Sequence, residues 1–129
     1  MKVALVGVTG YAGMVLYQLL KGHPNVDAIN LYGHDQAEAQ PLHEAVPQFG
    51  PTEDNLLLPY DPQAVMADND VLFFASSAGV ISTLATPYIA AHFPGIDLHG
   101  AHPPNAPALS AEAFPYPAHP QAPLRWRAL

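Results

Sequence analysis

Apolar positions follow two different periods along the first hundred residues, and together they predict alternating strands and helices. The segments at residues 2–6 and 70–75 are apolar after one charged first residue each, which is typical of parallel strands that are covered on both faces. Between residues 11 and 21, apolar side chains recur every three or four positions, which predicts an amphipathic helix. The side chains expected to face the sheet are those of Ala12, Val15, Leu16 and Leu19.

Shorter elements are expected between and after these segments. Gly22 is expected to end the first helix in a left-handed conformation. A second periodic helix is predicted over residues 80–92, with a bend caused by Pro87. The other predicted elements are strands at residues 26–32, 56–58 and 95–98, a short helix at 62–67 and a helical turn at 36–40. This order predicts an α/β fold, a Rossmann-like doubly wound sheet that is incomplete. Its parallel strands are expected at residues 2–6, 26–32, 70–75 and 95–98.

The character of the sequence changes after Gly100. Residues 101–129 contain seven prolines and eight alanines, and their large apolar side chains follow no strand or helix period. Prolines remove hydrogen-bond donors from helices and from strand ladders. We therefore expect one folded domain at residues 1–100 and a disordered Pro/Ala/His-rich tail at 101–129. The uncovered edge of such a sheet is expected to favour self-association.

Three glycines follow the first predicted strand. Gly7, Gly10 and Gly13 form a GxxGxxG motif between the apolar strand and the amphipathic helix. Glycine lets the backbone approach a pyrophosphate closely, and the amino end of the next helix directs N–H groups at the same anion. The motif predicts a nucleotide-binding turn, and an ordinary glycine-rich turn is the alternative.

Composition argues against several other classes of function. The net charge is −7 with four basic residues, which leaves no basic face for a nucleic acid. Because there is no apolar run of about 18 residues and no leader, we expect no membrane span, no signal peptide and a cytoplasmic location. The seven histidines show no helical i, i+4 pairing, so no metal site is expected. The chain has no cysteine, and therefore no thiol nucleophile.

The sequence resembles the N-acetyl-γ-glutamyl-phosphate reductases of the semialdehyde dehydrogenase group. The resemblance rests on MKVALVGVTGYAG at residues 1–13, DVLFFASSAGV at 70–80 and IDL at 96–98. It covers residues 1 to about 100, which match the amino-terminal NAD(P)-binding part of those enzymes.

The resemblance implies an NADPH-dependent reduction of N-acetyl-glutamyl phosphate to the semialdehyde, in arginine biosynthesis. In that reaction a cysteine thiolate attacks the acyl phosphate, and hydride transfer to the thioester releases the product. The family's catalytic cysteine and histidine lie beyond position 129, so no catalytic residue is assigned and the chain is expected to be inactive alone. The alternatives are a non-catalytic NAD(P)-binding or sensing module and, less favoured, a different dehydrogenase or epimerase that shares the glycine loop.

Matching the family's motifs assigns cofactor contacts residue by residue. The residues that match the pyrophosphate loop are Gly7, Thr9, Gly10, Tyr11, Ala12 and Gly13. The residues that match the turn near the nicotinamide are Ser76, Ser77, Ala78 and Gly79. Each serine could equally be a cap for the helix that follows.

The choice between NADP and NAD depends on the end of the second predicted strand. NAD sites usually place an acid there, about 20 residues past the glycines, to bind the ribose. Tyr32 and Gly33 occupy this end, so a 2′-phosphate would meet no repulsion. No arginine is available nearby, and His34, beside Asp35, is the nearest side chain that can carry positive charge. NADP is therefore expected, in line with the family, with NAD less favoured.

The family pattern stops shortly after the last predicted strand. Residues 97–100 keep the outline of the family's Asp-Leu-Ser-Gly-Asp-Phe-Arg sequence, and residues 101–104 abandon it. So abrupt a change resembles truncation by translation in a shifted reading frame. The alternative is a genuine divergent tail on a small nucleotide-binding module.

Overall fold

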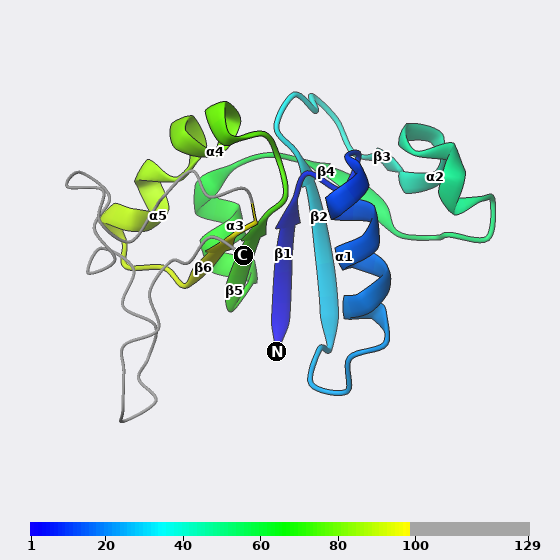
Figure 1. The fold of residues 1–129 in the computed structure, drawn as a ribbon, viewed down its shortest axis with the longest axis horizontal. Helices are drawn as coiled ribbons and strands as arrows, with labels where there is room; N and C mark the ends of the chain where they lie inside the picture. Colours follow the sequence, from blue (N-terminus) through cyan, green and yellow to red (C-terminus); the bar gives the residue numbers. More distant parts are fainter. Residues whose placement is uncertain (99–129) are drawn as a thin grey trace.

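Six strands form one sheet in residues 1–98, the part of the chain that the computed structural model describes. The strands are β1 (Lys2–Val6), β2 (Ala28–Gly33), β3 (Gln40–Pro41), β4 (Leu56–Pro59), β5 (Val71–Phe74) and β6 (Gly95–Asp97). Their order across the sheet is β3-β4-β2-β1-β5-β6 (Figure 1). Every neighbouring pair is parallel except β3 and β4, so the predicted parallel sheet is confirmed. The tail expected at 101–129 lies outside the described residues.

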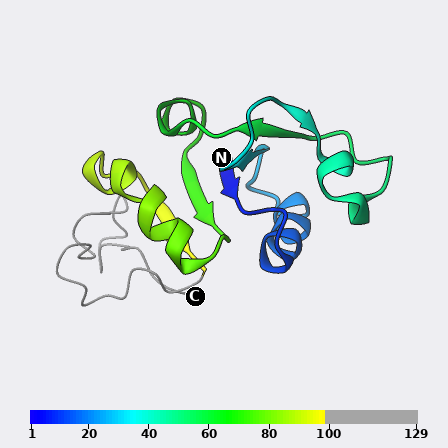
Figure 2. The same ribbon diagram turned by 90° about the horizontal axis from the view of Figure 1, so that it is seen from above.

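Helices cover both faces of the sheet, which confirms the Rossmann-like α/β class. The helices are α1 (Tyr11–Lys21), α2 (Leu42–Ala45), the 3-10 helix η1 (Pro47–Phe49), α3 (Pro62–Asp68), α4 (Ala78–Leu84) and α5 (Thr86–Ala90). Seen from above, α1 and α2 lie on one side of the sheet and α3, α4 and α5 on the other (Figure 2). None of these helices is long and apolar enough to cross a membrane.

Strand β1 lies between the two hydrophobic cores. Ala4 and Val6 face the core shared with α3, α4 and α5, whereas Leu5 faces the core shared with α1 and α2. All three side chains are completely buried. This two-sided burial explains why the strand is an unbroken apolar run rather than an alternating one.

Helix α1 rests on the sheet with a face that differs from the expected one. Its buried residues are Gly13, Tyr17 and Leu20, and its half-buried ones include Ala12 and Leu16. Val15 and Leu19, which were expected to face the sheet, are 43% and 68% exposed. The cause is Gly13: a Cβ there would lie 2.0 Å from the carbonyl oxygen of Gly7, so only this glycine allows the observed contact. That contact fixes the rotation of the helix.

Three further expectations are corrected. Gly22 ends α1 with a φ of −91°, in the right-handed region, because the chain turns at once through a bond from the His23 N–H to the Leu20 carbonyl (3.1 Å). The helical turn expected at 36–40 is absent, since the chain there leads into β3, which pairs with β4. The helix expected at 80–92 is divided at Ala85 into α4 and α5, because Pro87 lacks the N–H that would continue the helix.

Candidate functional site

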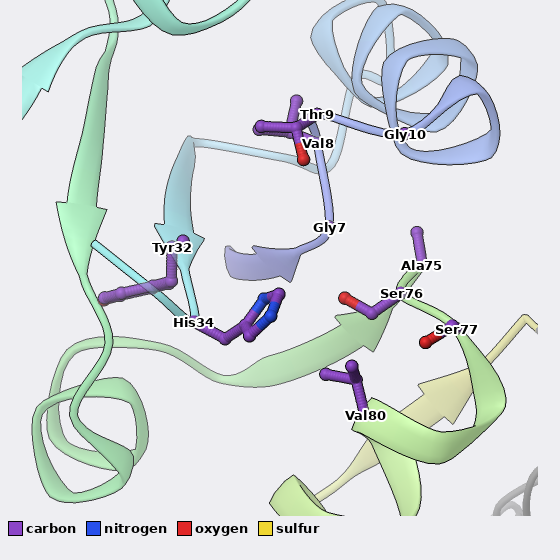
Figure 3. A pocket seen from close by; sticks show the side chains of 11 residues that line it. Gly7, Val8, Thr9, Gly10, Tyr32, His34, Ala75, Ser76, Ser77 and Val80 are labelled. Carbon is purple, nitrogen blue, oxygen red and sulfur yellow. The ribbon is translucent and has the colours of Figure 1, made fainter.

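A hollow of about 210 Å³ opens beyond the carboxyl ends of β1, β2 and β5. Its lining residues are Gly7, Val8, Thr9, Gly10, Tyr32, Gly33, His34, Ala75, Ser76, Ser77 and Val80 (Figure 3). From β1 the chain builds outward to β2 and β4, then crosses back to β5 and β6 on the other side. Parallel sheets bind ligands at such a reversal of strand order, beyond the carboxyl ends of the strands.

The loop after β1 is shaped by two glycines that the fold itself requires. Gly7 has a φ of +103°, and a Cβ there would lie 2.7 Å from the backbone nitrogen of Ser76. Gly13 is in direct contact with Gly7, as described above. Gly10 differs, because a Cβ there would lie 3.6 Å from the nearest atom, the Gly7 carbonyl oxygen. The fold has room for a Cβ at Gly10, so packing within this chain does not require a glycine at that position.

The amino end of α1 faces this hollow with its donors uncapped. Gly10 is the N-cap residue and has no side chain to accept from the first-turn N–H groups, and no acidic side chain lies in the first turn. These N–H groups have no acceptor within the helix, and the helix dipole is positive here. Such an end binds anions, phosphate groups in particular.

The end of β2 forms a second wall. Tyr32 is buried, and its hydroxyl accepts a hydrogen bond from Asn69 Nδ2 (3.1 Å). Burial raises the pKa of Tyr32, and the Asn69 bond only partly offsets this, so the phenol is neutral at ordinary pH. His34 is 37% exposed, and its Nε2 lies 3.1 Å from a carboxylate oxygen of Asp35. The imidazole points into the hollow, toward the side that carries Ser76 (Figure 3).

The turn between β5 and α4 closes the third side. The Ala75 N–H donates to the Val6 carbonyl (2.8 Å), which holds the turn beside the glycine loop. Ser77 is the N-cap residue of α4, the role that competes with ligand binding, but its hydroxyl makes no capping hydrogen bond. Its side chain is exposed at the rim of the hollow.

The structure brings together six of the residues that were assigned to cofactor contacts. The six that line the hollow are Gly7, Thr9, Gly10, His34, Ser76 and Ser77. Four of the others do not line it, namely Tyr11, Ala12, Gly13 and Gly79. Tyr11 is 81% exposed and lies on a different groove, while Gly13 acts through its contact with Gly7.

Sequence reasoning did not assign the other lining residues to the site. These are Val8, Tyr32, Gly33, Ala75 and Val80. Their position along the chain could have identified them, because all but Val80 lie at or just after the carboxyl end of a predicted strand. The residue types themselves carry no chemistry that would have identified them.

The lining carries groups that can bind an anion. They are hydroxyl groups, backbone N–H groups and the His34 imidazole, and none of the described lining residues is a carboxylate, lysine or arginine. Within the described residues, no group of three or more His, Asp or Glu side chains is arranged to hold a metal ion. The hollow is also smaller than the ~300–1,000 Å³ of a complete ligand pocket, so it would enclose only part of a dinucleotide.

Comparison with known proteins gives a family and several relatives. The family model for the semialdehyde dehydrogenase NAD-binding domain matches residues 2–117. An N-acetyl-γ-glutamyl-phosphate reductase of Limosilactobacillus fermentum is 51% identical over 100 residues, which cover 78% of this chain and 29% of that protein. N-acetyl-γ-glutamyl-phosphate reductase 2 of Lactiplantibacillus plantarum is 54% identical with the same coverage. The chain thus spans less than a third of the length of these relatives.

Solved structures share the fold. The aspartate semialdehyde dehydrogenase of Candida albicans, determined with NADP, matches 76% of this chain and 29% of its own, with a TM-score of 0.63 and 19% identity. A probable aspartate-semialdehyde dehydrogenase from Pseudomonas aeruginosa matches 93% of this chain and 36% of its own, with a TM-score of 0.60 and 25% identity. With the match of the family model over most of its length, the chain belongs to the family of semialdehyde dehydrogenase NAD-binding domains.

Proposed function

We propose that the chain is the cofactor-binding domain of an NADP-dependent N-acetyl-γ-glutamyl-phosphate reductase. The observation that carries the proposal is the hollow at the reversal of strand order, where the uncapped end of α1 and the glycine loop meet. The identity of 51–54% to two such reductases supports the choice of this substrate class. The bound cofactor would supply the hydride, and this domain would hold and orient it.

The residues of the hollow divide this task. The backbone of residues 7–10 and the start of α1 would bind the pyrophosphate through N–H groups, because no lysine or arginine is among the described lining residues. His34, at the end of β2, would face the 2′-phosphate of the adenosine ribose. Ser76 and Ser77, on the opposite wall, would line the path toward the nicotinamide.

On this proposal the chain by itself binds cofactor without turnover. Reduction of an acyl phosphate by this route requires a thiolate to form the thioester that accepts hydride. The chain contains no cysteine, and the hollow holds no other side chain suited to that step. A second candidate, a non-catalytic nucleotide-sensing module, shares the binding site and differs only in the absence of a catalytic partner.

The test is a titration of the ¹⁵N-labelled full chain with NADPH, followed by the backbone amide signals. We expect the amides of Thr9, Gly10 and Ser77 to shift, because they line the hollow. The amides of Lys21 and Asn55, at the other end of α1, are the internal control and should not move. Equal shifts at both ends, or none at any NADPH concentration, would overturn the proposed site.

A further inference from the structure

His34 holds a special position among the residues that line the hollow. Among the described residues, it is the one lining side chain that can carry a positive charge. The described lysines lie elsewhere. Lys21 binds Glu53 (2.6 Å), and Lys2 is at the amino end of β1, whereas the hollow lies beyond its carboxyl end. Within residues 1–98, a phosphate at the end of β2 would therefore find its positive partner in the imidazole of His34.

Asp35 competes for the same imidazole. Its carboxylate lies 3.1 Å from His34 Nε2 and is 89% exposed. Exposed pairs of this kind contribute little to stability, so the imidazole can exchange one anion for another at small cost. When the imidazole is neutral, the Asp35 carboxylate 3.1 Å away is no longer balanced by a positive charge, so the expectation of no repulsion at the end of β2 would not hold.

We propose that His34 and Asp35 form a proton-dependent selector between the 2′-phosphate of NADP and the 2′-hydroxyl of NAD. The inference rests on the proposed function, because it assumes that a nicotinamide dinucleotide occupies the hollow. In the protonated state the imidazolium binds the 2′-phosphate in place of Asp35. In the neutral state the Asp35 carboxylate repels that phosphate, yet it accepts a hydrogen bond from a 2′-hydroxyl.

Few other groups near His34 titrate in the relevant range. Asp35 stands on the same loop, and its carboxylate is the acid that faces the imidazole. The described residues of the glycine loop and of the β5–α4 turn contribute no acid or base to the lining, and burial raises the pKa of Tyr32 further above its ordinary 10.0. Histidine is the side chain whose charge changes between about pH 5 and pH 8. The ligand also titrates, since a phosphomonoester has a second pKa of about 6.

The test is the ratio of the dissociation constants of NADH and NADPH for the full chain, measured at about pH 6 and about pH 8 at fixed ionic strength. Wild-type selectivity for NADPH should fall by about fivefold from the lower to the higher pH, because the protein loses one charge-assisted contact that solvent already weakens. The His34→Ala variant is the control. Its selectivity should change less with pH than that of the wild type, because only the ionisation of the ligand's phosphate remains. Asp35→Asn should raise NADPH affinity at about pH 8 and weaken NADH binding.

Two failures are distinguishable. If both cofactors bind and the ratio changes by less than about twofold, or if His34→Ala keeps the full wild-type dependence, the selector is wrong and the proposed function stands. If neither cofactor binds at either pH, the proposed function is wrong and the selector with it.

Discussion

The amino end of helix α1 starts from a glycine loop without a side-chain cap, whereas its carboxyl end is fixed by a buried polar cluster. In that cluster Glu53, 7% exposed, accepts hydrogen bonds from Tyr17 Oη (2.8 Å) and Lys21 Nζ (2.6 Å). Asn55 Nδ2 in turn donates to the Tyr17 hydroxyl (3.1 Å). One end of the helix has no side-chain cap, and at the other end Tyr17 and Lys21 are both hydrogen-bonded to Glu53. On the proposed function, this difference separates a surface that binds a ligand from one that stabilises the fold.

The largest effect on folding is expected from Gly13→Ala, which breaks the contact that positions the amino end. The new Cβ would lie 2.0 Å from the Gly7 carbonyl oxygen, which is a backbone atom that cannot yield cheaply. We expect a loss of about 3 kcal/mol in the free energy of unfolding, measured with urea. A loss below about 1 kcal/mol would show that this contact does not fix the helix.

Removing the charge of Glu53 tests the carboxyl end. Glu53→Gln should lower the free energy of unfolding by about 1.5 kcal/mol, since two charge-assisted bonds weaken but Lys21 is partly solvated. The same measurement on Asp61→Asn, an exposed N-cap residue of α3, gives a comparison far from the cluster. If Glu53→Gln is neutral, the cluster is not what stabilises this end.

Acid should reveal the same cluster without mutation. Burial acts to raise the pKa of Glu53, but the Lys21 ammonium and the Tyr17 hydroxyl outweigh it, so the pKa lies below its usual 4.5. A carboxyl with a lowered pKa stabilises the fold above its unfolded pKa, and this stability is lost as pH falls through the folded value. Wild-type stability should therefore fall below about pH 4.5 more steeply than that of Glu53→Gln. Parallel pH curves would contradict the assignment.

A smaller effect is expected from Tyr17→Phe. This change removes one hydrogen bond to Glu53 and the acceptor for Asn55, and it keeps the buried ring. We expect a loss of about 1 kcal/mol. Burial raises the pKa of Tyr17 to about 12, so the variant should also lack one late-titrating phenol in an alkaline absorbance titration. An unchanged titration curve would show that the late-titrating phenol is not that of Tyr17.

The two ends of α1 also differ in how well the sequence predicted them. The glycine spacing located the loop and the start of the helix, because Gly7 and Gly13 are demanded by φ and by close contact. The apolar period did not identify the buried face, since α1 carries a second apolar stripe through Val15 and Leu19 that fits the same period. Only the tertiary contact at Gly13 decides between the two.

The Glu53 cluster was not predicted at all. Its members come from α1 and from the loop before β4, and nothing local in the sequence pairs a lysine with a glutamate 32 residues away. The segment around β3 and α2 was missed for a related reason: β3 has two residues, and its strand character depends on pairing with β4. In the site, lining residues such as Val8 and Ala75 are ordinary apolar residues that only the strand order brings together.

On the proposed function, the amino end of α1 binds the phosphates of a nicotinamide dinucleotide. A matched pair of glycine variants tests this binding most directly. Gly10 and Gly22 flank the same helix with φ values of −87° and −91°, and a Cβ fits at both, 3.6 Å and 3.8 Å from its nearest neighbour. Both Gly→Ala changes should leave the free energy of unfolding within about 1 kcal/mol.

The measurement is NADPH affinity by calorimetry for Gly10→Ala, Gly22→Ala and the wild type. We predict that Gly10→Ala weakens binding by about tenfold or more, because its Cβ fills the space where the pyrophosphate approaches the backbone. Gly22→Ala should bind like the wild type. Equal affinity in all three proteins, with folding intact, would contradict the claim.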